Sequence, residues 1–418
     1  MGLTVRDARL DDAVVGMRVE GDRIVALGPG IEPKAGDEVL EAAGMALLPG
    51  LVNGHTHAAM TLMRGYGDDL PLMTWLQDRI WPTEAKLTAD DVYWGTRLAC
   101  VEMIRSGTVR FWDMYWQPEA VARAVRDAGV RAAVAMPLVD GLDPDKSDAL
   151  RADTERSLDA LAGAGALVTP TLGPHAIYTV SEKSLQWIGE LSSERDLPVQ
   201  IHLSETEGEV RDCMAAHGVR PAPYLDSIGL LTPRTILAHG VWLDDDELAL
   251  VGERGATVVT NPVSNLKLAV GGVFPYAKAR EHGIPVGLGT DGAASNHSLD
   301  LFQDVKHLAL MQKHTARDPA AMPATEAWAV ATGQRAPLLG APGRVATGEP
   351  ADFLLVRTDA PELTPGDLTA NLVYAASGSV VDTTVVAGQV LMRGREVADS
   401  AVVREGVIAS ARRLGVIP

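Results

Sequence analysis

Short apolar runs alternate with longer amphipathic stretches through the middle of this chain. Eight of these runs have the composition of buried strands and end in polar residues. They are "LPGLVNGHTH", "GTVRFWDMY", "VRAAVAMPLV", "LVTPTLGPHAIY", "PVQIHLSE", "TILAHGV", "TVVTNPVSN" and "IPVGLGTDGAAS". Helical patterns separate them, and "SLDLFQDVKHLALMQ" places Leu299, Phe302, Val305 and Leu308 on one face. Eight successive strand–helix units predict an α/β fold, a (β/α)8 TIM barrel over residues 50–345.

The two ends of the chain have a different pattern, because they are rich in short β-like runs and turns. Near the N-terminus, "MRVEGDRIVALGPG" contains two such runs around Gly21-Asp22, which is a hairpin signal. Near the C-terminus, "PADFLLVRTD" and "SVVDTTVVAGQVLMRGREV" are similar, and the second is interrupted at Ala387-Gly388. We therefore expect residues 1–49 and 346–418 to supply the two parts of one small β-sandwich domain, followed by a tail.

Polar residues with useful chemistry gather at the ends of the predicted barrel strands. Five of the 10 histidines fall there, although a random surface would not sort them in this way. In chain order, the residues at these ends are His55, His57, His175, His202, Glu205, His239, Asn261, Ser264, Asn265 and Asp291. The C-terminal strand ends of such a barrel meet at one face, where its chemistry takes place.

His55 and His57 alternate as i and i+2, so both imidazoles face the same side of an extended strand. Taken alone, the pair is also compatible with a polar strand end whose histidines are hydrogen-bonded. With His202, His239 and Asp291 at other strand ends, the pattern predicts a metal site of imidazole and carboxylate ligands.

Glu205 follows His202 by three residues in "HLSETEGEV", where a carboxylate can carry protons for a metal-bound water. Glu207 and Glu209 are expected at a solvated helix start, where acidic residues complement the helix dipole.

A glycine-rich loop offers a rival interpretation of the last strand. "GLGTDG", residues 287–292, matches the spacing of a dinucleotide-binding loop. Such a site requires an acidic residue about 20 positions further on, and position 311 is Met. We therefore interpret Asp291 as a metal ligand rather than as part of a phosphate-binding loop.

The net charge of the chain indicates which classes of partner it is not expected to bind. The chain has 418 residues, with 37 Lys and Arg against 55 Asp and Glu, which gives a net charge of −18. Nucleic acids and anionic membranes attract basic patches, so neither is the expected partner.

The two cysteines, Cys100 and Cys213, are too few for a disulfide framework and are expected to be buried. No signal peptide or membrane-spanning run is evident, and we expect a cytoplasmic protein.

The strand-end residues resemble those of the amidohydrolase superfamily, which has H-x-H on strand one, His on strands five and six, and Asp on strand eight. The resemblance covers essentially the whole chain. Its most specific likeness is to 5′-methylthioadenosine/S-adenosylhomocysteine deaminases. The matching stretches are "LPGLVNGHTHAAMTLMRGYGDDLPLMTWL", "IWPTEAKLTADDVYWGTRLACVEMIRSGTV", "GPHAIYTVS", "IHLSETEGEV", "LAHGVWLDDDEL", "NPVSNLKLAVG" and "GLGTDGAASNHSLDLF".

This resemblance implies a role for each matching residue. His55, His57, His202 and Asp291 would bind one Zn²⁺ or another divalent metal. His239 would polarise the attacking water, Glu205 would pass a proton to the purine ring, and Asp291 would accept the proton of the water. Glu84 would grip the ribose hydroxyls, and His175 would line the nucleoside pocket. On capping chemistry alone, Glu84 could instead cap the helix that begins near "LTADD".

Three positions bear on the details of this resemblance. Two-metal versions of the barrel need a carboxylated lysine at the end of strand four, but Lys183 lies past that end, which favours one metal. The family often has Gly-Thr-Thr on strand two, where this chain has Gly107-Thr108 followed by Val109 and the charged Arg110. Arg151 is the first arginine that could meet an amino-acid tail on the substrate, and the substituent at the 5′ position stays open.

The resemblance implies hydrolytic deamination of an adenine nucleoside to an inosine-type product and ammonia. The substrate would be 5′-methylthioadenosine, S-adenosylhomocysteine or adenosine, and family likeness suggests a homo-oligomer. One alternative is a guanine or triazine aminohydrolase or chlorohydrolase on the same scaffold, for which a ribose-binding Glu84 would have no use. An alternative of another class is an inactive barrel that serves as an assembly scaffold.

Overall fold

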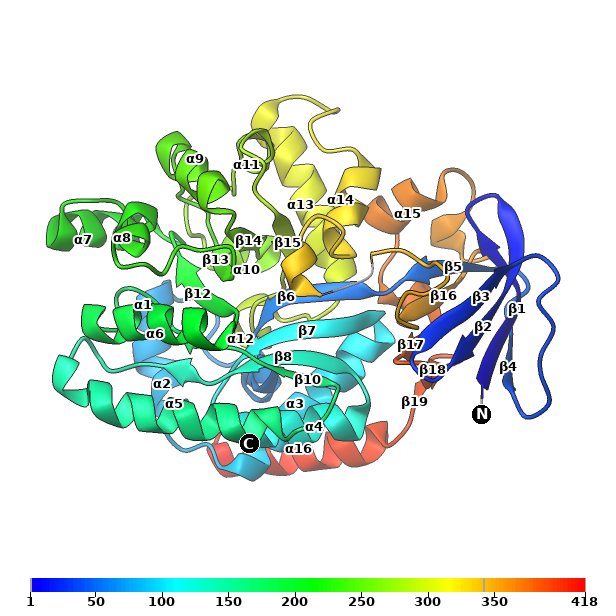
Figure 1. The fold of residues 1–418 in the computed structure, drawn as a ribbon, viewed down its shortest axis with the longest axis horizontal. Coiled ribbons are helices and arrows are strands. Elements are labelled where there is room, and N and C mark those ends of the chain that lie inside the picture. Colours follow the sequence, from blue (N-terminus) through cyan, green and yellow to red (C-terminus); the bar gives the residue numbers. More distant parts are fainter. Residues whose placement is uncertain (1, 341–342, 418) are drawn as a thin grey trace.

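A parallel barrel occupies the centre of the computed structural model, which describes residues 2–340 and 343–417 (Figure 1). Each of the eight runs predicted from the sequence forms strand structure there. The strands are β6 (Leu51–Thr56), β7 (Thr108–Met114), β8 (Arg131–Ala135), β9 (Pro137–Leu138), β10 (Val168–Pro170), β11 (Gly173–Pro174), β12 (Val199–Leu203), β13 (Thr235–His239), β14 (Thr257–Thr260) and β15 (Val286–Leu288). The predicted barrel fold is therefore confirmed.

The barrel is built from two four-stranded parallel sheets, β6-β7-β8-β10 and β12-β13-β14-β15. Parallel bridges from Leu172 to Val199 and from Ala176 to His202 join the first sheet to the second. On the other side, the Asp291 amide donates to the His55 carbonyl over 3.0 Å, which joins strand eight to strand one. This closure brings the C-terminal ends of all the strands to one face.

Helices follow the strands around the outside of the barrel. Their apolar faces pack inward, as predicted for Phe302, Val305 and Leu308, which are at most 2% exposed. The helices are α3 (Ala89–Arg105), α4 (Pro118–Ala128), α5 (Ser147–Ala162), α6 (Glu182–Arg195), α7 (Glu207–His217), α8 (Pro221–Ser227), α9 (Asp245–Arg254), α10 (Pro262–Lys267), α11 (Tyr276–Glu281), α12 (Ala293–Asn296), α13 (Leu301–Ala316) and α14 (Ala324–Ala331).

A helical segment after β6 covers part of the barrel mouth. It consists of η1 (Ala58–Met63), α1 (Leu72–Trp75), a π-helical turn η2 (Leu76–Ile80) and α2 (Trp81–Glu84). Thr88 and Asp91 then cap α3 reciprocally, because each side chain accepts a hydrogen bond from the other backbone amide. Glu84 ends α2 and is not this cap.

Both ends of the chain join in one nine-stranded sheet at the side of the barrel. The N-terminal strands are β1 (Gly2–Leu10), β2 (Ala13–Glu20), β3 (Arg23–Gly28), β4 (Glu38–Glu41) and β5 (Met45–Pro49). The C-terminal strands are β16 (Phe353–Arg357), β17 (Val381–Val386), β18 (Gln389–Arg393) and β19 (Glu396–Val397). Antiparallel pairing of β5 with β16 joins the two groups. The division of the chain at residues 49 and 345 stays a prediction.

The sheet has its own apolar core, which includes Val5, Met17, Leu47 and Phe353. Both predicted hairpins are present, at Gly21-Asp22 and at Ala387-Gly388. The second turn has φ of 50° and 73°, the left-handed pair that matches the twist of a tight hairpin.

One buried ion pair in this sheet involves Asp37. Arg18 donates to both carboxylate oxygens of Asp37, over 2.8 and 3.1 Å. The Thr4 hydroxyl and the Lys34 amide also donate to this carboxylate. The Asp37 side chain is 2% exposed, so its charge is both buried and fully hydrogen-bonded.

The remaining helices lie in connections within the barrel, within the sheet and between the two. The connections between strands include η3 (Pro144–Lys146), η4 (Pro337–Leu339), η5 (Pro361–Leu363), α15 (Leu368–Tyr374) and η6 (Gly378–Val380). The last helix, α16 (Ser400–Leu414), leaves the sheet and packs against α3 (Figure 1). There Arg413 forms an ion pair with Asp91. Among the described residues, no helix has both the length and the apolar character that a membrane crossing requires.

Two arginines singled out in the sequence have partners within the barrel domain. Arg110, in the first half of β7, donates to the Thr169 hydroxyl over 3.2 Å, and its burial lowers its pKa. Arg151 stacks over the Trp187 ring at 5.1 Å, between α5 and α6. Cys100 and Cys213 are buried free thiols, as expected.

Candidate metal centre and cavity

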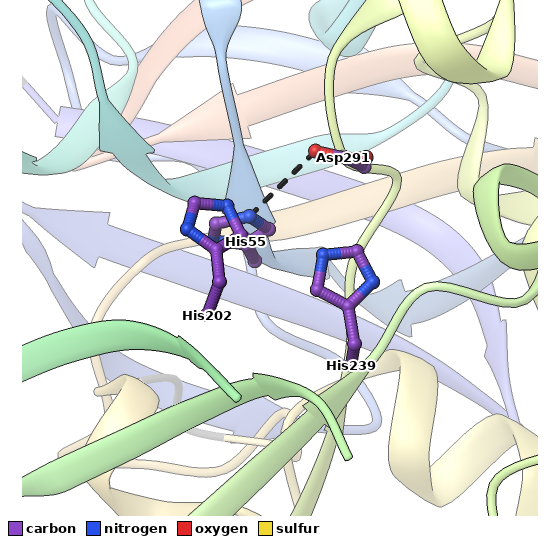
Figure 2. A group of neighbouring side chains, drawn as sticks. All are labelled: His55, His202, His239 and Asp291. Atoms are coloured by element: carbon purple, nitrogen blue, oxygen red, sulfur yellow. Dashed lines mark ion pairs between the residues drawn. The ribbon is translucent and has the colours of Figure 1, made fainter. Parts of the chain in front are cut away.

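The structure brings the strand-end histidines together. His55, His202, His239 and Asp291 project toward a common point from β6, β12, β13 and the loop after β15 (Figure 2). The His57 ring joins them, with its centroid 4.9 Å from that of His55 and 5.3 Å from that of His202. The i, i+2 spacing on the first strand therefore places both imidazoles in one cluster, as predicted.

In each of the four clustered histidines, the Nδ1 atom lies within hydrogen-bond distance of an oxygen. The His57 Nδ1 lies 2.7 Å from the Met114 carbonyl, and the His202 Nδ1 lies 2.7 Å from the His175 carbonyl. The His55 and His239 Nδ1 atoms face amide oxygens of Gln200 and Asn265, at 3.4 and 2.8 Å. A carbonyl oxygen only accepts, so Nδ1 carries the hydrogen and Nε2 presents a lone pair.

In the neutral imidazoles these Nε2 atoms carry lone pairs, and they converge. The Nε2 atoms of His57 and His202 are 3.2 Å apart, and the buried Nε2 of His55 has no hydrogen-bond partner among the described residues. Two lone pairs at this distance repel unless a cation lies between them. Two nitrogens bound to one tetrahedral zinc ion lie about 3.3 Å apart, given Zn–N distances of 2.0–2.1 Å. The spacing and the donor chemistry therefore fit a divalent metal ion.

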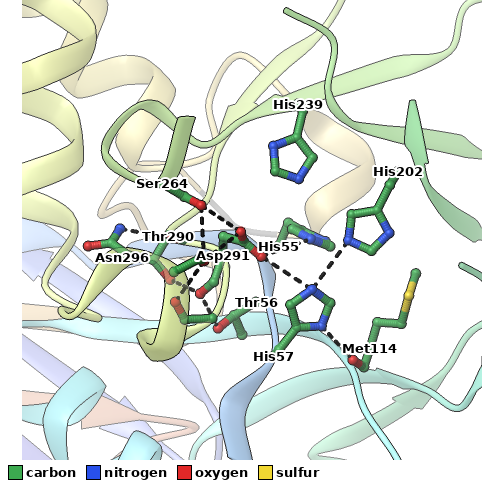
Figure 3. A network of polar contacts seen from close by, with 12 residues as sticks. His55, Thr56, His57, Met114, His202, His239, Ser264, Thr290, Asp291 and Asn296 are labelled. Carbon is green, nitrogen blue, oxygen red and sulfur yellow. Dashed lines mark hydrogen bonds and ion pairs between the residues drawn. The ribbon is translucent and has the colours of Figure 1, made fainter. Parts of the chain in front are cut away.

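Asp291 is oriented to complete this group (Figure 3). Its Oδ2 accepts hydrogen bonds from Ser264 and Ser295, over 2.7 and 2.8 Å. Its Oδ1 faces the imidazoles, 3.2 Å from the His57 Nε2 and 3.7 Å from the His55 Nε2. One oxygen is thus held by the protein, and the other is available to a metal or a water.

Two overlapping sets of four residues could hold the ion. The predicted set contains His57, whose Nε2 lies 3.2 Å from both a His202 nitrogen and an Asp291 oxygen. A second set replaces His57 with His239, and its ligand atoms all lie within 4.8 Å of one another. The His239 ring is farther from the others, with centroids 5.8 Å from His55 and 5.5 Å from His202. The short contacts of the His57 Nε2 atom favour His57 over His239 as the fourth member of a ligand set.

Glu205 lies next to this cluster, in the loop after β12. Its side chain is 5% exposed, and its Oε1 is 3.9 Å from the His239 Nδ1. Burial raises the pKa of Glu205, while the neighbouring His239 lowers it in part. A raised pKa makes a carboxyl group easier to protonate, which suits a proton carrier.

A cavity of about 690 Å³ opens from these residues to the surface. Its floor is formed by His57, His202, Glu205, His239 and Asp291. Its walls are largely apolar and aromatic. The wall residues include Met60, Leu72, Trp75, Leu76, Ile80, Trp81, Tyr115, Trp116, Leu142, Tyr178 and Leu268. A mostly apolar cavity with a few convergent polar groups is typical of a small-molecule site.

Glu84 and His175 both line this cavity, as predicted. Burial raises the pKa of Glu84, and the adjacent Tyr115 and Trp116 lower it in part. The His175 Nδ1 pairs with the Thr179 hydroxyl over 2.9 Å, and burial lowers the pKa of His175 to about 4. His175 is therefore a neutral imidazole at physiological pH, with Nε2 as its remaining polar atom.

Glu209 differs from the sequence expectation. Glu207 is exposed, but Glu209 is 7% exposed and was wrongly assigned to a solvated helix start. Its carboxylate turns back and accepts hydrogen bonds from the Ser204 and Glu205 amides. The spacing Thr206-x-x-Glu209 could have indicated that Glu209 accepts backbone hydrogen bonds, because it matches the sequence of a capping box.

Other supporting residues had weak sequence signals or none. Gln200, which holds His55 and donates to the Asp113 carbonyl, lies two residues before His202 on the same strand face. Period-two alternation could have identified it. Ser264 and Asn265 were placed at a strand end without a role. Ser295 was missed, because its contact with Asp291 depends on the turn into α12.

Two further sequence interpretations can be compared with the structure. The glycines of "GLGTDG" allow close packing: a Cβ at Gly289 would lie 2.3 Å from the Asn261 side chain and 2.9 Å from the His55 carbonyl. Lys183 lies on the surface, where its amine donates to the Pro144 carbonyl over 3.3 Å. It is not among the described residues that line the cavity.

Comparison with known proteins identifies the family. Residues 46–391 match the Amidohydrolase family model. A 5′-deoxyadenosine deaminase of Methanoregula boonei is 51% identical over 378 residues, which cover 90% of this chain and 86% of that protein. A 5-methylthioadenosine/S-adenosylhomocysteine deaminase 1 of Archaeoglobus fulgidus is 43% identical over 380 residues, which cover 90% and 89%.

Solved structures agree with this assignment. An adenosine deaminase from Xanthomonas campestris with bound zinc superposes with a TM-score of 0.92 at 33% identity, over 99% of both chains. A triazine hydrolase variant superposes with a TM-score of 0.89 over 100% of both chains, but at 21% identity it shows the shared fold alone. The chain belongs to the amidohydrolase family.

Proposed function

We propose that this protein is a zinc-dependent aminohydrolase that deaminates an adenine nucleoside to the inosine-type nucleoside and ammonia. The observation that carries the proposal is the convergence of imidazole Nε2 atoms and the Asp291 carboxylate beside Glu205, at the floor of a cavity of about 690 Å³. The relatives are named as deaminases of adenosine-type nucleosides.

The protein's own residues have distinct tasks in this reaction. A zinc ion bound by His55, His57, His202 and Asp291 supplies Lewis acidity that lowers the pKa of a water toward about 7. Asp291 Oδ1 accepts a proton from the attacking water, and His239 orients that water beside the cluster.

Glu205 completes the proton transfer. Its buried carboxyl group protonates the ring nitrogen next to C6, which makes that carbon a better electrophile. Water adds to C6, and the proton that Asp291 takes from it passes to the amino group, so that the C6–N bond breaks and ammonia leaves. The hydroxyl proton left on the C6 oxygen returns to Glu205, which restores its carboxyl group and leaves the C6 carbonyl of the product. One water is consumed and one ammonia is released for each nucleoside.

Glu84 and His175 are the residues that favour a nucleoside over a free base as the substrate. Both line the same cavity as the cluster, and in this proposal the sugar of a bound nucleoside lies beside them. A carboxylate accepts hydrogen bonds from two adjacent hydroxyls, and the neutral His175 can pair with another polar atom of the substrate.

The cavity wall favours an uncharged substituent at the 5′ position. Among its lining residues within the described ranges 2–340 and 343–417, none is lysine or arginine. Arg151, the candidate for an amino-acid tail, stacks on Trp187 instead. A substrate carboxylate would therefore be desolvated without a counter-charge, which is unfavourable. A deoxy or methylthio group would pack against residues such as Trp75 and Leu142.

Ammonia release across a substrate panel tests the proposal. The panel contains 5′-deoxyadenosine, 5′-methylthioadenosine, adenosine, S-adenosylhomocysteine, guanine and melamine-type compounds. We expect deamination of the adenine nucleosides, with the highest kcat/KM for those whose 5′ group is small and uncharged. Release from guanine or a triazine alone would establish the alternative activity of the same scaffold. No release from any compound, with metal confirmed in the protein, would contradict the proposal.

Several features of the protein in the cell stay predictions. The sequence predicts a cytoplasmic protein without a nucleic-acid partner, and family likeness suggests a homo-oligomer.

A further inference from the structure

The backbone between β12 and α7 makes a tight turn that presents Glu205 to the cavity. Ser204 adopts a left-handed conformation with φ of 51°, which is unusual for a residue with a side chain. Glu205 follows, and Thr206 then caps α7 by accepting a hydrogen bond from the Glu209 amide. His202 thus lies at the end of β12 before the left-handed Ser204, and Glu205 lies directly after it.

The Glu209 side chain holds this turn from the helix side. Its Oε1 accepts from the Ser204 amide and its Oε2 from the Glu205 amide, each over 2.9 Å. In an ordinary capping box, the acidic residue would bond to the amide of the cap residue, here Thr206. Glu209 instead reaches one and two residues further back and uses both oxygens, so it holds the N–H groups of two successive peptides, Leu203–Ser204 and Ser204–Glu205.

A second set of contacts holds the turn from the neighbouring strand. The Trp242 amide donates to the Ser204 carbonyl over 2.9 Å, and the Gly240 amide donates to the Leu203 carbonyl over 3.0 Å. These amides lie one and three residues after His239, which ends β13. The turn is therefore clamped between α7 and the segment that carries His239, which sets the 3.9 Å separation of Glu205 Oε1 from His239 Nδ1.

We propose that Glu209 is a positioning residue that fixes the direction of the Glu205 carboxyl group relative to His239. The inference rests on the proposed function, because Glu205 needs a fixed direction only if it transfers protons to a substrate. Glu209 lies in an unfavourable place for a charge, and burial raises its pKa to about 8. Its two hydrogen bonds end on the turn before the helix, so capping α7 does not account for them.

Three matched variants separate positioning from helix capping. Glu209→Gln keeps the size of the side chain but turns an amino group toward one of the two amides. Glu207→Gln makes the same substitution in the same helical turn, at an exposed position. Thr206→Ala removes the ordinary cap and leaves the Glu209 side chain intact.

We expect Glu209→Gln to lower kcat about 10- to 100-fold, the size of effect that a small misplacement of a catalytic group produces. KM and bound zinc should match those of Glu207→Gln. The Ser204 and Glu205 amides should exchange with solvent faster in Glu209→Gln than in Glu207→Gln. Thr206→Ala should lower the melting temperature while leaving kcat near that of the wild type.

Three results would overturn the inference. They are a kcat of Glu209→Gln equal to that of Glu207→Gln, a loss of zinc that parallels the loss of rate, and a loss of rate in Thr206→Ala as large as in Glu209→Gln. If Glu209→Gln does not fold, Glu209→Asp repeats the test, because it keeps both acceptors but is too short to reach both amides. Failure of both variants to fold would show a structural role and also overturn the inference. A wild-type protein without deaminase activity contradicts the proposed function instead, and amide exchange then still tests the clamp.

Discussion

Two buried aspartates, one in the terminal sheet and one at the barrel mouth, are held in opposite ways. Both oxygens of Asp37 accept hydrogen bonds from Arg18, and Thr4 and Lys34 add further donors. Asp291 has one oxygen held by two serine hydroxyls, while the other faces imidazole lone pairs at 3.2 and 3.7 Å. The first carboxylate is satisfied by the protein alone, and the second is not.

This difference separates a group that serves stability from one that serves chemistry. A buried charge whose hydrogen bonds are all made stabilises one folded arrangement of the chain. A buried polar group that lacks some of its hydrogen bonds lowers the stability of the fold unless a ligand binds there. Such groups therefore concentrate at functional sites. The predictions below test this contrast, beginning with the largest expected effect.

Removal of the metal should abolish activity without unfolding the terminal sheet. Without a cation, the lone pairs of His57 and His202 face each other at 3.2 Å, and the reacting water loses its activation. Dialysis against a chelator should eliminate ammonia release, and added zinc should restore it in proportion to the bound ion. Amide exchange in β1 and β2 should stay unchanged. Full activity in metal-free protein would show that the cluster has another role.

Glu205→Gln should lower kcat about 10²- to 10⁴-fold, the usual contribution of a general acid–base group. Gln has a similar size but cannot transfer a proton, so the zinc content and the melting temperature should stay near those of the wild type. Steady-state kinetics with metal analysis measures this effect, and Glu207→Gln is the control on the same turn. A near-normal rate in Glu205→Gln would exclude it as the proton carrier.

Glu84→Gln should reduce kcat/KM for nucleosides about 10-fold or more, the effect expected on losing a hydrogen bond to a charged group. The loss should be smaller for a dideoxy analogue, because that substrate has no ribose hydroxyls to bind. Comparison of the two substrates in both proteins measures the coupling between Glu84 and the sugar. Equal losses for both substrates would contradict a ribose contact.

Asp37→Asn should lower the melting temperature at neutral pH and leave kcat unchanged. The hydrogen bonds from Arg18 hold the pKa of Asp37 below its usual range, so its ionised form is favoured in the folded state. This stabilisation is present above the unfolded pKa of about 3.9 and is lost as the pH falls through the folded pKa.

The melting-temperature difference between wild type and Asp37→Asn should therefore shrink as the pH is lowered below 4. Thermal unfolding measured across this pH range tests the expectation. A difference that grows on acidification would mean that the ion pair does not stabilise the sheet.

Lys183→Ala should have the smallest effect. The Lys183 amine is exposed on α6 and contacts the Pro144 carbonyl, outside the cavity. Its removal should not change the number of zinc ions bound per chain or the rate of deamination. A loss of bound metal in Lys183→Ala would overturn the prediction of a one-metal site.

The parts predicted correctly from the sequence depend on short-range periodicity. The alternation of buried strands with amphipathic helices predicted the barrel, and the i, i+2 spacing of His55 and His57 predicted their common direction. Both hairpins followed from turn pairs such as Ala387-Gly388. In each case the neighbours along the chain contain the information.

The sequence did not reveal the surroundings of residues whose partners lie far along the chain or in an unusual local turn. Glu209 has the composition of an exposed helix start, yet the left-handed Ser204 turns the chain so that two amides face its carboxylate. Arg151 was considered for the substrate tail, but the packing of α5 on α6 places it over Trp187. No periodicity in the sequence carries these directions.

The sequence by itself determined the elements, the strand-end position of the histidines and the donor types of a metal site. Only the tertiary structure decided which atoms meet. Asn53 and Thr290 are 237 residues apart and yet hydrogen-bond where the barrel closes, beside His55 and Asp291. The physical reason is that strand and helix patterns follow from local repeats of about 2 and 3.6 residues, whereas the distance between two lone pairs depends on the closure of the whole barrel.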